Sequence, residues 1–241
     1  MSSTLSIANS DPVFTGGGRT RALTVKRSAQ ARRMRLAVDP RDGTVRLTLP
    51  RRAALAPALK WAESQRVWIE TALAALPHPT PWGNGATFPF DGTTLTLEWL
   101  AGPRTVRREG DRLVVGGPPE LAPGRALRWL RAEAARRLEA ETRALATQAG
   151  IEVGKVRIGD PRTRWGSCSS SGDIAYSWRL ILAPPAVREA TVAHELAHRI
   201  HMHHGPEFHE EVARLLGRDP KPERAWLKAH GAALHGIGRD D

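Results

Sequence analysis

The sequence predicts an α+β fold in which a β-rich N-terminal part is followed by a part that mixes helices with strands. Three observations lead to this prediction. Short runs of alternating apolar and polar residues dominate the first 120 residues. A stretch with three prolines, from Gly116 to Gly124, interrupts that pattern. Long runs with apolar residues at helical spacing then follow, and they predict amphipathic helices.

The N-terminal part is expected to contain one helix among several strands. Apolar residues at helical spacing predict a helix from 55 to 76, which Pro77 ends. A Pro/Gly-rich connector spans Pro77 to Phe90, and Asp42-Gly43 is expected to form a hairpin turn. Alternating patterns predict strands at 22–25, 34–38, 45–49, 93–99, 104–109 and 113–115.

The C-terminal part begins with a long predicted helix from Arg125 to Gly150, whose apolar residues share one face. Gly150 is expected to stop this helix, because glycine readily adopts the left-handed conformation of a helix end. Strands are predicted at 153–158 and 174–182, with a loop at 159–172 between them. The segment 173–182 is our candidate for an exposed sheet edge that binds an extended peptide.

These patterns divide the chain into a disordered N-terminus (1–20), a β-rich basic domain (21–120) and a C-terminal domain (121–241). The first 18 residues lack the apolar core of a secretory signal, and no later apolar run approaches a membrane span. We therefore expect a cytoplasmic protein that does not enter membranes. Cys168 is the lone cysteine, which excludes an internal disulfide. Cys168 is expected to pack as a small residue rather than act as a nucleophile.

The positive charge is concentrated in the first part of the chain. Residues 1–150 hold 23 Lys+Arg and 13 Asp+Glu, a difference of +10, whereas residues 151–241 hold 13 and 12, a difference of +1. Such a basic half could attract nucleic acid without sequence specificity. The alternative is that these arginines only solvate the surface, because aromatic residues suited to base stacking are not interleaved with the basic clusters.

The strongest chemical motif is His194-Glu195-Leu196-Ala197-His198. On a helix, residues four positions apart share a face, so both imidazoles can bind one zinc ion while Glu195 faces the water bound to it. A small, apolar run, Ala190 to Ala193, precedes the motif and predicts a buried helix. Charged and polar side chains at such a place are costly unless a metal or partners satisfy them.

A third ligand is expected from the segment that follows the motif. His204-Gly205-Pro206 is typical of a helix end, a turn and a new helix start, and such a turn could bring His204 to the metal. Glu211, on the next helix, is the main competitor. His201 lies a full helical turn beyond His198 and is expected to flank the site. Three nitrogen ligands would leave a fourth position for water.

Several separate motifs, in this order, resemble the YgjP-like metallopeptidases, a family similar in its core to the SprT-like and WLM zinc peptidases. They are Arg164-Trp165-Gly166-Ser167-Cys168-Ser169, Trp178-Arg179-Leu180, Ala183-Pro184-Pro185, the His194–His198 motif and His204-Gly205-Pro206-Glu207-Phe208. The resemblance implies a zincin-like minimal metallopeptidase domain with the motif on a core helix. It also implies one Zn²⁺ per chain, bound by His194, His198 and His204, with Glu195 as the catalytic glutamate and a protein or peptide as substrate.

In the expected reaction, Glu195 accepts a proton from zinc-activated water, which attacks a peptide carbonyl. Tyr176 and His203 are candidates to stabilise the negative intermediate. His201, His203 and Glu189 are candidates to orient the ligands. The alternative function is a nucleic-acid-associated zinc protein, or a protease recruited to DNA-bound proteins. An open three-histidine site favours the enzyme, because structural zinc sites usually close with four protein ligands.

Overall fold

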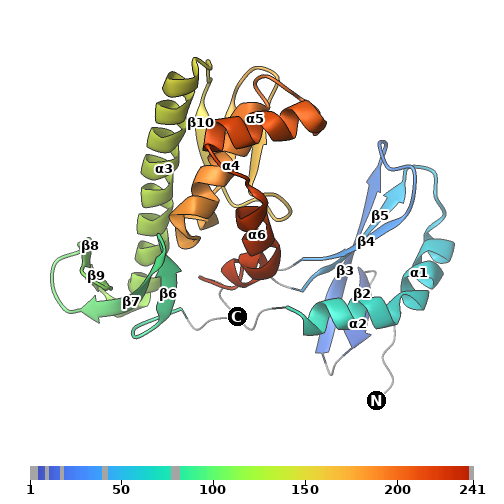
Figure 1. Ribbon diagram of the computed structural model, residues 1–241. Helices are drawn as coiled ribbons and strands as arrows, with labels where there is room; N and C mark the ends of the chain where they lie inside the picture. The colour runs from blue at the N-terminus through green and yellow to red at the C-terminus, as the bar shows by residue number, and fades with distance from the viewer. Residues whose placement is uncertain (1–4, 9–10, 17–18, 40–42, 77–81, 239–241) are drawn as a thin grey trace. The chain divides into compact units, whose positions relative to one another are not determined.

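The computed structural model confirms a mixed α+β protein (Figure 1). It describes five segments of the chain, residues 5–8, 11–16, 19–39, 43–76 and 82–238. The chain forms two compact units, Met1–His78 and Pro79–Asp241, which are described separately. In the described segments, every helix is too short or too polar to cross a membrane.

The first unit is a five-stranded sheet with two helices. The strand order is β1-β2-β3-β5-β4, in which β3 and β5 run parallel and the other neighbours run antiparallel. The elements are β1 (Leu5–Ala8), β2 (Asp11–Gly16), β3 (Arg19–Ser28), β4 (Arg35–Val38), β5 (Val45–Pro50), α1 (Leu55–Ser64) and α2 (Arg66–Ala74). The predicted helix 55–76 is thus two helices that meet at Gln65.

Strands β1 and β2 differ from the expected disorder of residues 1–20, since the described residues 5–8 and 11–16 pair in the sheet. Phe14 of β2 is fully buried in the core of this unit, which explains why a largely polar segment folds. The predicted strands at 22–25, 34–38 and 45–49 are present. The predicted turn at Asp42-Gly43 falls partly outside the described residues.

The second unit contains a four-stranded sheet, a three-stranded sheet and four longer helices among its described residues. The first sheet has the order β6-β7-β9-β8 and the second β10-β12-β11. The strands are β6 (Thr87–Phe90), β7 (Thr93–Leu100), β8 (Val106–Glu109), β9 (Arg112–Gly116), β10 (Val156–Gly159), β11 (Gly166–Cys168) and β12 (Ile174–Ser177). The helices are α3 (Ala122–Ala149), α4 (Pro185–Ala197), α5 (Pro206–Leu216) and α6 (Lys221–Leu234), with the 3₁₀-helices η1 (Pro119–Leu121) and η2 (Trp178–Leu182).

The division after His78 differs from the boundary expected near residue 120. The sheet β6–β9 packs in the same hydrophobic core as α3 and α4. A buried ion network adds to this packing, because Arg188 of α4 donates to Glu141 of α3 and, at 2.8 Å, to Asp91 between β6 and β7. The Asp91 N–H also donates to the Ile181 carbonyl at 2.8 Å. The prolines near residue 120 therefore form a connection within one unit.

Helix α3 is the long helix that the sequence predicts, and it runs beside α4 and β10 (Figure 1). Its buried residues recur every four positions and form one stripe against the core, namely Ala122, Ala126, Leu130, Ala134, Leu138, Thr142 and Ala146. Gly150 ends the helix with a φ of 67°, as predicted, because this left-handed conformation suits glycine.

The strand predicted at 174–182 is only half present. It ends at Ser177, whose hydroxyl accepts the Arg179 N–H at 3.3 Å, and residues 178–182 form η2. The alternation of apolar and polar residues wrongly predicted a strand here, because every residue of η2 is buried rather than every second one. The expected loop 159–172 contains the short strand β11, and the expected connector before Phe90 contains β6.

Candidate metal centre

Helix α4 carries the His194–His198 motif and lies in the core of the second unit. Pro185 occupies its first turn, where a proline costs no hydrogen bond, and the helix ends at His198. The small residues Ala190 and Ala193 are buried, which allows close packing by neighbouring elements. The helix thereby places polar motif residues where only a partner or an ion could satisfy them.

Three histidines converge at the end of this helix. The ring nitrogens of His194, His198 and His204 that could bind a metal all lie within 4.8 Å of one another. His194 Nε2 and His204 Nε2 are 3.3 Å apart. Two nitrogens bound to one tetrahedral zinc at about 2.1 Å would be separated by about 3.4 Å. The donor set and its spacing therefore fit a zinc ion.

The segment between α4 and α5 places His204 beside His194 and His198, and extended Gly205 then caps α5. Helix α5 starts at Pro206, directly after Gly205, and Phe208 in its first turn is fully buried. The Phe208 ring packs against the rings of all three histidines, with centroids 4.6 to 4.9 Å apart. Phe208 thus supports the three imidazoles from one side.

A backbone hydrogen bond orients His198. Its Nδ1 lies 3.2 Å from the His201 carbonyl oxygen, which can only accept, so Nδ1 carries the proton in this arrangement. Nε2 then keeps its lone pair for a metal. His201 contributes to the site through its backbone here. The His201 and His203 side chains lie outside the group of converging ring nitrogens, so an orienting role for them stays a prediction.

Burial keeps His194 and His198 neutral, which is the form that binds metal. Burial, followed by the charges of neighbouring residues, lowers the pKa of His194 to about 4. Burial also lowers the pKa of His198, although its bond to the His201 carbonyl acts in the opposite direction. Both rings therefore present unprotonated nitrogens near neutral pH.

Glu195 lies beside this cluster and is only 4% exposed. Burial raises the pKa of its carboxyl to about 7, while the charge of Arg164 acts against that shift. Among the described residues, its Oε2 atom is buried and has no hydrogen-bond partner. Burying a carboxyl oxygen without a hydrogen-bond partner costs folding free energy. This atom can therefore accept a hydrogen bond from a water or a substrate group.

Strand β11 lies so close to Glu195 that a side chain at position 166 would displace the Glu195 carboxylate. A Cβ atom on Gly166 would lie 2.3 Å from Glu195 Oε1 and 2.7 Å from its Cδ atom. The neighbouring Trp165 packs against α6, where a Cβ atom on Gly231 would lie 2.7 Å from the indole. Gly166 thus allows β11 to lie close to α4, and Gly231 makes room on α6 for the Trp165 ring.

We expect Gly166→Ala to lower the thermal unfolding midpoint of the second unit. Inserting a methyl group into a packed site costs about 1–3 kcal/mol, and each kcal/mol lowers the midpoint by about 2–4 °C in a unit of this size. Gly83→Ala is the control, because a Cβ atom there meets no atom within 4 Å. Scanning calorimetry of the metal-free chains compares them. An equal midpoint for both variants would contradict the close packing of β11 on Glu195.

Other residues considered from the sequence lie elsewhere. Glu211, the competitor to His204, binds Arg214 through both carboxylate oxygens, at 2.6 and 2.9 Å. Tyr176 is 1% exposed, and its hydroxyl lies 3.1 Å from that of Thr142 in the core, so Tyr176 cannot stabilise a substrate intermediate. Glu189 is exposed and pairs with Arg218, which leaves it no role beside the histidines.

The candidate peptide-binding edge also differs from the expectation. Strand β12 is the centre of its sheet, because β10 pairs with one side and β11 with the other. The sheet has two edge strands, β10 and β11, and β11 is the one that lies beside α4. The Ser177 N–H donates to the Trp165 carbonyl, and the Ser169 N–H donates to the Asp173 carbonyl. These two bonds show which residues of β11 form backbone hydrogen bonds with β12, because bonded and non-bonded pairs alternate along antiparallel strands. In that pattern, the backbone N–H and C=O groups of Gly166 and Cys168 point away from β12.

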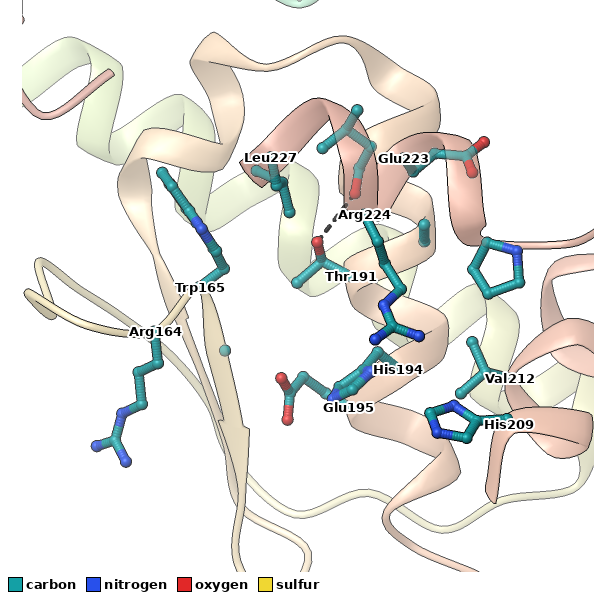
Figure 2. A pocket seen from close by; sticks show the side chains of 14 residues that line it. Arg164, Trp165, Thr191, His194, Glu195, His209, Val212, Glu223, Arg224 and Leu227 are labelled. Atoms are coloured by element: carbon teal, nitrogen blue, oxygen red, sulfur yellow. Dashed lines mark hydrogen bonds between the residues drawn. The ribbon is translucent and has the colours of Figure 1, made fainter. Parts of the chain in front are cut away.

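A pocket of about 230 Å³ opens next to His194 and Glu195 (Figure 2). Its walls come from α4, α5 and α6 and from the segment that leads into β11. The apolar lining residues are Trp165, Val187, Ala190, Val212, Pro220 and Leu227. Sequence reasoning did not find this pocket, since its walls come from four segments that only the tertiary fold brings together.

A helical His-Glu-x-x-His motif whose histidines converge with a third one is typical of metallopeptidases. The chain belongs to the YgjP-like family, because the model of the YgjP-like metallopeptidase domain matches residues 32–230. This match confirms the resemblance seen in the sequence and makes the protein a metallopeptidase of that family. Among curated proteins and among solved structures, none gave a significant match.

Proposed function

We propose that this protein is a zinc-dependent peptidase with a zincin-like core, in which α4 presents the His-Glu-x-x-His motif to an extended substrate. The observation that carries the proposal is the convergence of three histidine nitrogens within 4.8 Å, beside a buried glutamate. His194, His198 and His204 would hold the ion, and Glu195 would be the catalytic residue. The direct test is whether the zinc-loaded chain hydrolyses an unfolded protein and whether Glu195→Gln abolishes that hydrolysis.

The chemistry divides between the ion and Glu195. When bound, zinc supplies a Lewis acid that polarises a peptide carbonyl and lowers the pKa of water. Glu195 accepts the proton of the attacking water, and it later donates that proton to the leaving amine. Its raised pKa suits both tasks, since a group that titrates near 7 can accept and release a proton near neutral pH.

The open edge of β11 supports an extended substrate. The backbone groups of Gly166 and Cys168 face outward, so a peptide could add to the sheet as a further strand. Gly166 lies against Glu195, so a peptide paired there would pass next to the catalytic carboxylate. Backbone pairing is independent of the substrate's side chains, which is why we infer an endopeptidase that acts on unfolded segments.

A second candidate function, non-specific binding of nucleic acid, is favoured by one face of the sheet in the first unit. Lys26 of β3 and Arg35 of β4 both pair with Thr48 of β5, so the three side chains share one face of the sheet. Lys26 and Arg35 are exposed. The arginines of α3 support this function less well, because Arg136 and Arg143 pair with Glu133 and Glu139 on the same helix.

If this face binds DNA, the affinity of the whole chain will fall steeply with salt, because each neutralised phosphate releases counterions. The double variant Lys26→Gln/Arg35→Gln should reduce the salt slope by about 1 for each lost phosphate contact. Fluorescence anisotropy with a labelled duplex measures both effects. Arg136→Gln/Arg143→Gln is the control of equal charge. A wild-type chain that does not bind at about 50 mM salt excludes this function.

A further inference from the structure

The pocket beside Glu195 contains an arginine whose side chain forms no ion pair or hydrogen bond among the described residues, although its charge also acts on Asp219. Arg224 of α6 lines the pocket and extends toward His194 (Figure 2). Among the described residues, its guanidinium takes part in none of the ion pairs or hydrogen bonds. The side chain is exposed, so a ligand can reach it.

The other charged residues that line the pocket are occupied or point elsewhere. Glu223 accepts from Arg218 at 3.0 Å, and its carboxylate points away from His194 (Figure 2). Arg164 also points away from the pocket (Figure 2). Glu195 is the proposed catalytic group. The pocket therefore combines apolar walls with the guanidinium of Arg224, which extends toward His194, whereas Arg164 lines the pocket but points away from it.

We propose that Arg224 binds a carboxylate of the substrate residue that enters this pocket, a proposal that rests on the peptidase function above and adds a substrate class to it. Guanidinium and carboxylate groups form paired, charge-assisted hydrogen bonds, which are stronger where the walls exclude water. A pocket of about 230 Å³ is smaller than the site of a drug-sized ligand and suits a single side chain or chain end. The carboxylate belongs either to an aspartate or glutamate side chain or to the free C-terminus of the substrate.

Matched peptides test this proposal through hydrolysis. A peptide with one glutamate next to the bond that is cut should have a kcat/KM about tenfold or more above that of its glutamine twin, because a hydrogen bond to a charged group contributes that much. Arg224→Gln should bring the ratio close to one. Arg224→Glu should favour a peptide with lysine at the same place. Mass spectrometry of the products locates the cut.

Lys228→Ala is the matched control. Lys228 is exposed on α6, one turn from Arg224, and it does not line the pocket. This variant loses the same charge and should keep the glutamate-to-glutamine ratio of the wild type. Zinc content and thermal unfolding of all variants verify that the fold is intact.

The source of the carboxylate is decided by a second pair of peptides, with a free or an amidated C-terminus. A preference that disappears on amidation assigns the pocket to the chain end. A preference that survives amidation and follows the glutamate assigns it to an acidic side chain. Either preference supports the proposal if the Arg224→Gln variant no longer shows it.

Binding separates this proposal from the proposed function. The zinc-loaded Glu195→Gln variant, titrated with the same fluorescent peptides, should bind the carboxylate peptide about tenfold more tightly than its neutral twin. If that preference is present while the wild type hydrolyses no peptide, the peptidase function fails and the carboxylate site stands. Equal binding and equal hydrolysis of both peptides by the wild type would overturn the inference about Arg224 and leave the peptidase function intact.

Discussion

Glu195→Gln is expected to keep its zinc and to lose at least about 10²-fold in peptide hydrolysis, because removal of a positioned proton acceptor has an effect of this size. Glutamine preserves the size of the side chain, and it cannot accept the proton of the attacking water near neutral pH. The variant should remain folded, since Glu195 Oε2 has no hydrogen-bond partner among the described residues to lose. Hydrolysis of a labelled unfolded protein measures the effect.

Glu189→Gln is the control for that variant. Glu189 lies on the same helix, is exposed, and forms an ion pair with Arg218 at 3.3 Å. Its replacement removes the same charge from α4 without touching the histidines, so hydrolysis should stay close to that of the wild type. Similar rates for wild type and Glu195→Gln, at equal zinc content, would remove Glu195 from the reaction.

His204→Ala is expected to lose most of its zinc. The remaining pair, His194 and His198, cannot hold an ion that needs at least three protein ligands. The affinity should fall by more than the 10–100-fold that loss of an outer-shell partner costs. Zinc per chain, measured by elemental analysis after dialysis, gives the result.

Two variants control for this loss. His203→Ala removes an exposed histidine from the same loop, and Glu211→Ala removes the competing carboxylate, which Arg214 already binds. Both should retain one zinc per chain. If Glu211→Ala lost its zinc while His204→Ala kept it, Glu211 and not His204 would be the third ligand.

The sequence predicted the metal site better than the fold around it, for a physical reason. His194 and His198 are four residues apart on one helix, so helix geometry alone places them together. His204 lies on the segment that joins α4 to α5, and Gly205-Pro206 marks locally where α5 begins. The structure brings these three side chains together as predicted, whereas their role as zinc ligands stays a proposal.

Features that depend on contacts between distant segments were not predictable in this way. Arg188 binds Asp91 across 97 residues of sequence, and this contact helps to join the β6–β9 sheet to the helices. The prolines near residue 120 suggested a boundary there because local composition carries no information about such contacts. The pocket that contains Arg224 likewise depends on α6, which approaches α4 only in the folded chain.

Strand pairing was the least predictable part of the site. The large apolar residues from Ile174 to Leu182 are buried, and burial alone does not say whether a strand is central or lies at an edge. The edge strand β11 is only three residues long and contains Gly166, which has low strand propensity. The contact with Glu195 explains the glycine in this strand, because a side chain at position 166 would meet the Glu195 carboxylate.

A crystal structure of the zinc-loaded protein, with anomalous diffraction at the zinc edge, tests whether the three histidines form an open zinc site. We predict one zinc peak per chain, bound by His194, His198 and His204, with a water in the remaining position next to Glu195. A zinc ion bound by four protein side chains, or one placed away from α4, would rule out an open catalytic site at these histidines.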